Sequence, residues 1–384
     1  MGWERKIPII SKRPEEPSLV LWLSVAIVAL IASVLLFVLH ANQLLGAFQS
    51  FSIWLLSATP LVIWFTLICL RGWLYNLAFN RYKFETDEAE YAQQQWSAWA
   101  GRYLAVLHSV ALLPGSLTAT QLILLPPGLE RYGQQTRRVH WSEAEGLTIL
   151  LGEVSDALLQ LPVDLPLNVT FLTDSPRNIS SLQALFDDCW KGLIPAERPA
   201  PKLNILQSHS LLILDERLKS PEISAELVLV QQLQGGEKYS DALIVLLLVS
   251  DDVATKYQFK HDVRLLRPMG LDPSRLSEEL ALYFSTQTQA NSAQFIAGDQ
   301  LRWADDFFEL LKASETSGGY WKAEQAQWLE TFSGISGPFS PWVMAAVSSD
   351  IVRLQQDDCL MLSADEEQSF ITTVTTGKQN NENG

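Results

Sequence analysis

The sequence predicts a two-helix transmembrane hairpin followed by a layered α/β domain. Two apolar stretches, residues 19–41 and 51–70, come early in the chain of 384 residues. From residue 114 onward, segments with the patterns of strands and helices alternate, as they do in layered α/β proteins. The charge also divides the chain: residues 1–83 hold seven Lys/Arg and three Asp/Glu, whereas residues 84–384 hold 21 and 40. A basic, apolar front end therefore precedes an acidic body.

The two apolar stretches are long enough to be membrane helices. Residues 19–41 contain no charged side chain unless His40 is protonated, and such a helix spans the roughly 30 Å hydrocarbon core of a bilayer. Residues 51–70 include Pro60, which membrane helices tolerate. We therefore expect residues 19–70 to contact the lipid bilayer as a helical hairpin.

The distribution of Lys and Arg predicts the orientation of this hairpin. Positive charges lie in the tail of residues 1–18 and again after the second stretch, at Arg71, Arg81 and Lys83, but the connecting loop has none. Because positive flanks stay in the cytoplasm, both termini should be cytoplasmic. The expected location is the bacterial inner membrane, with a multi-pass topology.

Residues 84–113 have the pattern of an amphipathic helix that connects the hairpin to the body. Trp96, Trp99 and Tyr103 recur at helical spacing within it. This aromatic stripe predicts either core packing or a surface for a protein partner.

The body is expected to be a cytoplasmic α/β domain over residues 114–376, with two halves near 114–200 and 200–376 and a disordered tail at 377–384. The run ALIVLLLV within residues 240–252 is typical of a central strand buried on both faces. Residues 223–234 and 240–252 form either a hairpin or a helix that leads into a strand. Other strands are expected at residues 117–127, 165–174, 202–215, 359–363 and 369–376, and helices at residues 142–161, 179–193, 276–286, 301–313 and 341–355.

The sequence contains none of the common signatures for phosphate, dinucleotide or zinc sites. We therefore predict no cofactor, no metal and no catalytic residue, and the acidic body argues against nucleic acid as a partner. Cys189 as a nucleophile would need a nearby activating His; the alternative is a small buried side chain. Asp251 and Asp252 follow the apolar strand, where open α/β sheets bind ligands, and are either a ligand site or a solvated turn.

Three segments resemble the later half of the thiolase and ketoacyl-synthase fold: SDALIVLLLVSDD, SGISGPFSPWVMAAVSSDIVRL and CLMLSADEEQSFITTV. The resemblance covers residues 200–376 and implies two layered halves. This family needs a reactive Cys and two His, or His and Asn, in Gly-flanked loops. His209 and His261 do not stand in such loops, so no catalytic residue is carried over. The resemblance implies a degenerate, binding-only version of the fold.

The overall plan also looks like that of accessory inner-membrane proteins of bacterial secretion systems, type VI in particular. Our first hypothesis is a non-enzymatic membrane-anchored adaptor whose body binds a protein, because tryptophan, of which the chain has 13, is enriched at interface anchors. The alternatives are an immunity or sensor protein that binds a toxin at the inner membrane, and an acyl-group enzyme that uses Cys189.

Overall fold

The structure is a computed structural model that describes residues 2–377 apart from 7, 197, 366 and 367. The chain forms two compact units. We call Lys6–Gln95 the anchor unit, and Met1–Arg5 together with Trp96–Gly384 the body. The predicted tail beyond residue 377 lies outside the described residues.

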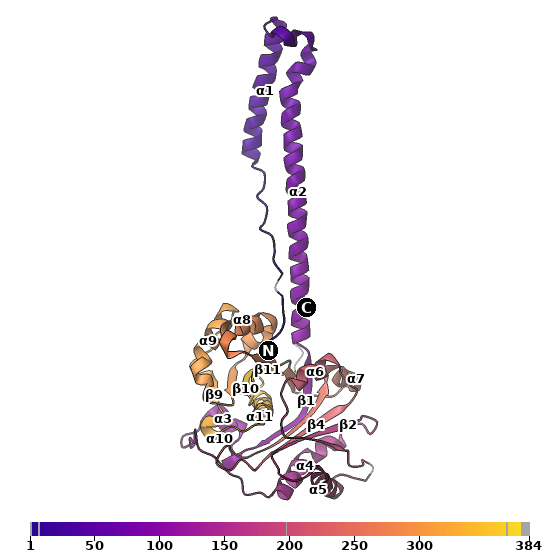
Figure 1. Cartoon of the computed structure of the whole chain (residues 1–384), viewed down its shortest axis with the longest axis vertical. Coiled ribbons are helices and arrows are strands. Elements are labelled where there is room, and N and C mark those ends of the chain that lie inside the picture. The colour runs from indigo at the N-terminus through magenta and orange to yellow at the C-terminus, as the bar shows by residue number, and fades with distance from the viewer. Residues whose placement is uncertain (1, 7, 197, 366–367, 378–384) are drawn as a thin grey trace. The chain divides into compact units, whose positions relative to one another are not determined.

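The anchor unit consists mainly of two helices, α1 (Leu19–Ala41) and the first part of α2 (Ile53–Ala100), joined through a short 3₁₀ helix (Gly46–Ser50). Both helices contain stretches long and apolar enough to cross a membrane. α1 has the predicted bounds, whereas the second predicted span is only the beginning of a 48-residue helix. Residues 8–18, which precede α1, form neither helix nor strand (Figure 1), and the Ser11 amide donates to Glu85 on α2 at 2.8 Å.

The first half of the body contributes five strands to one mixed sheet, in the order β3-β2-β4-β5-β1. β2, β3 and β4 are parallel, whereas β5 is antiparallel to β4 and to β1. The strands are β1 (Tyr103–Leu112), β2 (Leu167–Thr173), β3 (Leu203–Leu206), β4 (Ala225–Gln232) and β5 (Ala242–Ser250). The helices are α3 (Ala119–Leu124), α4 (Glu143–Leu159), α5 (Ile179–Leu193), α6 (Ile213–Lys219) and α7 (Asp251–Tyr257), with a 3₁₀ turn at Pro114–Ser116.

The second half repeats this order as β9-β8-β10-β11-β6, with the same pattern of parallel and antiparallel pairs. The strands are β6 (Val263–Leu266), β7 (Met269–Leu271), β8 (Phe295–Gly298), β9 (Ala326–Trp328), β10 (Cys359–Ala364) and β11 (Ser369–Thr376). The helices are α8 (Leu276–Thr286), α9 (Trp303–Thr316), α10 (Glu330–Ser333) and α11 (Ser340–Gln355), with 3₁₀ turns at Pro273–Arg275, Thr288–Ser292 and Ala323–Gln325.

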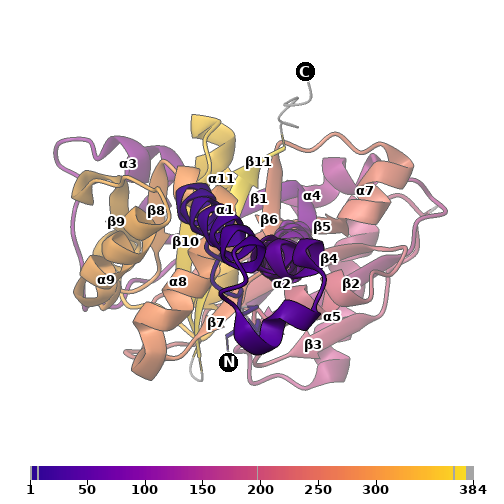
Figure 2. The same ribbon diagram turned by 90° about the horizontal axis from the view of Figure 1, so that it is seen from above.

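The two halves meet where β1 pairs antiparallel with β6, from Tyr103 opposite Leu266 to Val106 opposite Val263. Figure 2 shows them side by side, with α8 and α9 on one side and β2, β3 and α5 on the other. The body is therefore a structural duplication, which the sequence alone does not reveal as a repeat.

Side chains that alternate along the strands feed separate cores. In β5, Ile244, Leu246 and Leu248 join a central core with α6 and α11, whereas Leu243 and Val245 join the core under α4 and α5. A third core lies under α8 and α9 in the second half. All nine residues of β5 are buried, so the prediction of a strand covered on both faces is confirmed.

Several sequence predictions hold in detail. Helix α5 has the predicted bounds, and α4 begins with the expected capping box of Ser142 and Glu145. The strands predicted at 165–174, 359–363 and 369–376 are β2, β10 and β11. The helices expected at 276–286, 301–313 and 341–355 correspond to α8, α9 and α11. Of the two alternatives for residues 223–252, the hairpin is the one found, as β4 and β5.

Three predicted elements and the predicted boundary between the halves were wrong. The first half does not end near residue 200, because β3, β4 and β5 belong to its sheet order and β5 ends at Ser250. The connecting helix 84–113 ends at Ala100, because residues 103–112 pair with β5 and β6 on both sides as β1. Residues 119–124 are helix α3 instead of a strand, started by a capping box between Thr118 and Gln121. The strand expected at 202–215 stops at Leu206, and helix α6 begins at Ile213.

Candidate functional site

Both chain segments that lead to the anchor unit are fixed in one aromatic cluster of the body. The Trp3 ring lies 5.3 Å from Trp99, edge to face, and 5.4 Å from Tyr283. Trp96 packs edge to face on Trp99 at 5.1 Å. The Trp3 indole N–H donates to the Pro268 carbonyl at 3.3 Å. We call Trp3, Trp96, Trp99 and Tyr283 the base cluster.

Arg267 closes the end of helix α2 in this cluster. Its guanidinium lies 4.1 Å from the Trp99 ring, and its Nε donates to the Trp99 carbonyl at 3.1 Å. The side chain is 1% exposed and forms an ion pair with Asp215 on α6. A cation at a helix C-terminus donates hydrogen bonds to the last carbonyls and interacts favourably with the helix dipole. Arg267 therefore stabilises the end of α2 at this position.

The three residues predicted as one partner surface are separated by the structure. Trp96 and Trp99 belong to the base cluster, where both are half-buried. Tyr103 begins β1 and contacts the His261 ring at 5.7 Å and the Arg264 guanidinium at 4.4 Å. The helical stripe is broken because the helix ends between Trp99 and Tyr103. A partner-binding role for these side chains stays a prediction.

Asp251 and Asp252 lie in the first turn of α7 and both bind Arg102. The Arg102 Nε and Nη2 atoms donate to the two Asp251 oxygens at 2.9 and 2.7 Å, and Nη2 also reaches Asp252 at 2.6 Å. Hydrogen bonding to Asp251 raises the pKa of Arg102. This arrangement fixes the junction between α2 and β1, and the predicted ligand site stays a prediction.

Cys189, Cys359 and His209 have structural surroundings. Cys189 is half-buried on α5, and its Sγ lies 3.4 Å from the Thr148 hydroxyl on α4. Cys359 is buried, which raises the pKa of its thiol to about 12. His209 is stacked on Trp342 at 5.5 Å, and the Trp342 indole donates to the His209 carbonyl at 2.8 Å. Burial lowers the pKa of His209. The two contacts between His209 and Trp342 join the first half to helix α11 of the second.

Each half holds an aspartate directly after an equivalent strand, β2 in the first half and β8 in the second. Asp299, after β8, accepts from the Trp303 indole and Ser340 hydroxyl at 2.7 Å and from the Ala364 amide at 2.9 Å. Asp174, after β2, accepts from the backbone amides of residues 233 and 234 at 3.0 and 2.8 Å. Burial raises the pKa of Asp299 to about 6. Both carboxylates clamp the end of the neighbouring strand, β4 or β10.

The halves differ most in the connection that follows their first strand. In the first half, residues 113–142 separate β1 from α4, whereas residues 272–275 separate β7 from α8 in the second. We call residues 113–142 the inserted segment. Its later part is held by backbone hydrogen bonds: the Tyr132 amide donates to the Thr331 carbonyl at 2.8 Å and the Ile335 amide to the Gln135 carbonyl at 3.0 Å.

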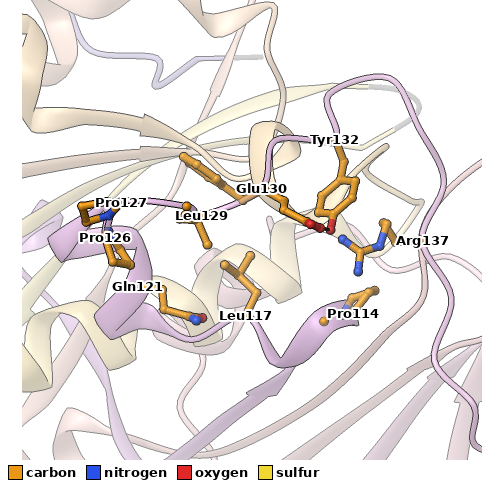
Figure 3. A pocket seen from close by; sticks show the side chains of 12 residues that line it. Pro114, Leu117, Gln121, Pro126, Pro127, Leu129, Glu130, Tyr132 and Arg137 are labelled. Atoms are coloured by element: carbon orange, nitrogen blue, oxygen red, sulfur yellow. Dashed lines mark hydrogen bonds between the residues drawn. The ribbon is translucent and has the colours of Figure 1, made fainter.

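The inserted segment lines a cavity of about 330 Å³ that is open to solvent (Figure 3). Leu117, Leu129, Pro126 and Pro127 form its apolar part, and Phe332 of α10 adds to the lining. At the other end of the view Arg137 lies beside Tyr132, with the Cζ atom 3.6 Å from the ring centroid. The Tyr132 hydroxyl donates to Glu130. Among the described residues this is a cavity of ligand size with a cation in its wall.

Sequence reasoning missed both of these places. Arg137 and Arg138 form the only tight basic pair of an acidic body, which was the available signal for the cavity. Trp3 stands in a basic tail without a local pattern of apolar residues, and its partners Trp99 and Tyr283 lie far along the chain. No pattern of local spacing reports such contacts.

No protein-family model and no curated protein matches the sequence. Solved structures that are similar to the chain include a ketosynthase–acyl-carrier protein complex of a type II polyketide synthase, with 9% identity, 72% of this chain and 99% of that chain covered, and a TM-score of 0.49. Human mitochondrial 3-ketoacyl-CoA thiolase has 9% identity, 73% and 99% coverage, and a TM-score of 0.46. For 3-oxoacyl-[acyl-carrier-protein] synthase III of Aquifex aeolicus the values are 12%, 71% and 99%, and 0.42. The chain is thus similar in structure to proteins of the group that the three sequence segments resemble, and with TM-scores below 0.5 these likenesses carry no argument about family or activity.

Proposed function

We propose that the chain is a non-enzymatic, membrane-anchored adaptor whose α/β body binds a protein partner. The observation that carries this proposal is the inserted segment. The second half has no counterpart of this segment. Backbone hydrogen bonds to residues of the second half hold its later part in place, and apolar side chains are exposed at its surface. Leu124, at the end of α3, is 70% exposed and is followed by the 38% exposed Leu125. Exposed apolar groups beside a cavity are typical of interaction sites.

We propose that the anchor unit spans the bacterial inner membrane, with both termini in the cytoplasm. Two apolar helices and the Lys/Arg-free loop between them support this topology. In the base cluster, Trp3 of the N-terminal segment contacts Trp99 near the end of α2. The two chain segments that lead to the anchor unit therefore lie together in the body. Membership of a secretion system stays a prediction that the identity of the partner would test.

The test is co-purification of tagged full-length protein from membranes in mild detergent, with partners quantified by mass spectrometry. We expect one near-stoichiometric partner for the native chain. Leu124→Glu should reduce its recovery at least about tenfold, because a charge replaces an apolar contact worth about 1.5–3 kcal/mol. Leu159→Glu is the matched control, since Leu159 on α4 is also an exposed helical leucine (54%).

Equal recovery with Leu124→Glu and Leu159→Glu would overturn the proposed docking at the inserted segment. Absence of any stoichiometric partner would overturn the adaptor function as a whole. Cys189→Ala separates the acyl-enzyme hypothesis, because an adaptor should bind its partner equally well without this thiol. Cys189 is half-buried at the border of the core under α4 and α5, and alanine removes only its sulfur atom, so the variant should fold.

A further inference from the structure

The cavity of the inserted segment contains the guanidinium of Arg137. No hydrogen bond or ion pair from another described residue reaches the Arg137 guanidinium; its contact is the face of Tyr132. The neighbouring Arg138 is different, because it forms an ion pair with the buried Asp241. Glu130, which also lines the cavity, is engaged by the Tyr132 hydroxyl. The five N–H donors of Arg137 are therefore available to a ligand.

The backbone holds Arg137 in place. Its amide donates to the Ser240 hydroxyl at 3.1 Å, and its carbonyl accepts from the Asp241 amide at 2.9 Å. Gly115, with φ of +70°, faces the guanidinium, and a Cβ there would lie 2.9 Å from Arg137 Nη2. The absence of a side chain at Gly115 thus gives the guanidinium its room. A cation fixed in this way loses little conformational freedom when it binds.

The side chains that line the cavity away from Arg137 favour a ligand whose anionic group is carried on an apolar group. Leucine and proline side chains line the wall away from Arg137, with Gln121 as a polar group among them, so a fully hydrated anion such as phosphate would leave most of that wall unused. A carboxylate pairs with a guanidinium through two parallel hydrogen bonds, and a short apolar group would cover Leu117 and Leu129. A volume of about 330 Å³ accommodates a small group of this kind.

We propose that this cavity binds a carboxylate carried on an apolar group, with Arg137 as the residue that recognises the carboxylate. This inference rests on the proposed adaptor function only where it takes the C-terminus of a protein partner as the ligand. The same chemistry is offered by the C-terminus of a polypeptide that ends in an apolar residue and by a free short-chain acid.

The test is calorimetric titration of full-length protein in lipid nanodiscs with three probes: hexanoate, its neutral analogue hexanamide, and N-acetyl-Ala-Leu with a free carboxylate. We expect at least one carboxylate to bind with Kd of about 1 mM or tighter, a typical range for such small ligands. Hexanamide should bind about tenfold more weakly than hexanoate, because it cannot form the charge-assisted pair. Tighter binding of the dipeptide would identify a chain end as the source, and tighter binding of hexanoate a free acid.

Variants of the inserted segment decide whether Arg137 is responsible. Arg137→Gln should weaken carboxylate binding about tenfold or more, whereas Arg137→Lys, which keeps the charge and loses the planar fork, should retain part of the affinity. Arg131→Gln is the matched control, since Arg131 is an exposed arginine of the same segment. Failure of both carboxylates to bind, equal binding of hexanamide, or unchanged affinity in Arg137→Gln would each overturn the proposal.

The outcomes separate this inference from the proposed function. A chain that captures a stoichiometric partner through Leu124 but binds neither carboxylate loses the cavity assignment and keeps the adaptor function. A chain that binds hexanoate through Arg137 but captures no partner keeps the cavity assignment and loses the adaptor function.

Discussion

The two halves of the body have the same strand order and yet differ in what they add to it. Both arrange five strand positions identically and cover one face with two helices, α4 and α5 or α8 and α9. The second half supplies the 16-residue α11 to the central core, where the first half supplies the seven-residue α6. The first half instead carries the inserted segment with its cavity. The helices that both halves share cover the sheet. The inserted segment has no counterpart in the second half, and we therefore expect the binding function there.

The halves also differ in how their equivalent groups are buried. The aspartate clamp of the second half, Asp299, is fully buried, whereas Asp174 of the first is half-exposed. The first strand of each half is irregular: β1 has a bulge at Leu107, and Arg267 and Pro268 interrupt β6 and β7. In the second half this interruption places a charged side chain at the base cluster. We expect the second half to dominate stability and the first to dominate binding.

The largest effect should come from Arg267→Ala. The substitution removes the cap from helix α2 and the contact with Trp99, and it leaves Asp215 with Lys219 as its remaining ion-pair partner. The cost should be at least about 3 kcal/mol in the free energy of unfolding, the lower end of the range for a broken buried ion pair. Urea unfolding of the detergent-solubilised protein, followed by tryptophan fluorescence, measures this change. Arg275→Ala is the control, because the Arg275–Glu278 pair is 65% and 72% exposed and should contribute less than about 0.5 kcal/mol. Similar costs for the two variants would contradict the assigned role of Arg267.

The parts of the fold that the sequence predicts are those with local signals. The capping box at Ser142, the apolar run of β5 and the long apolar helix α1 all depend on neighbouring residues. The wrong elements are those whose neighbours are distant. Residues 103–112 have helical spacing, but they become β1 because strands from residues 242–250 and 263–266 lie on both sides. The duplication is likewise visible only in the strand order.

The candidate site was predictable only in part, for the same reason. Trp96 and Trp99 were identified as an aromatic stripe, but the Trp3 and Arg267 groups that pack on them come from the N-terminus and from the second half. Asp251 and Asp252 were identified at the end of β5, but their partner Arg102 lies almost 150 residues earlier. The sequence indicates which side chains are candidates for binding. Contacts with distant residues then decide which of these side chains are already paired within the fold and which can bind a ligand.

A smaller effect, specific to the second half, is the pH dependence caused by Asp299. Burial raises the pKa of Asp299 to about 6 in the folded protein, so the folded state holds a proton that the unfolded state has already lost above about pH 4. The stability that this group contributes is fully present below about pH 4 and is lost as the pH rises through about 6. The loss should approach 3 kcal/mol, at roughly 1.4 kcal/mol for each pKa unit.

Unfolding of the native chain and Asp299→Asn between pH 4 and 7 isolates this dependence as a difference in slope. Asp299→Asn should lack the loss, because the amide does not titrate. Asp174→Asn alters the equivalent clamp of the first half and should keep the slope that Asp299 causes, because Asp299 itself is intact. A native slope that persists in Asp299→Asn would mean that other buried carboxyl groups, such as Asp350 and Asp358, produce it.

The smallest effect concerns the contact that joins the halves, between His209 and Trp342. Trp342→Phe and His209→Ala should be coupled in a double-mutant cycle by about 0.5–1 kcal/mol, because the stacked rings interact beyond their buried area. Trp190 is the matched residue, since its indole also donates to a carbonyl, at Arg198, but within the first half. Trp190→Phe and His209→Ala should be additive within about 0.3–0.5 kcal/mol. Additivity in both cycles would mean that the halves are held together by the β1–β6 pairing and the shared core, with no specific contribution from this stack.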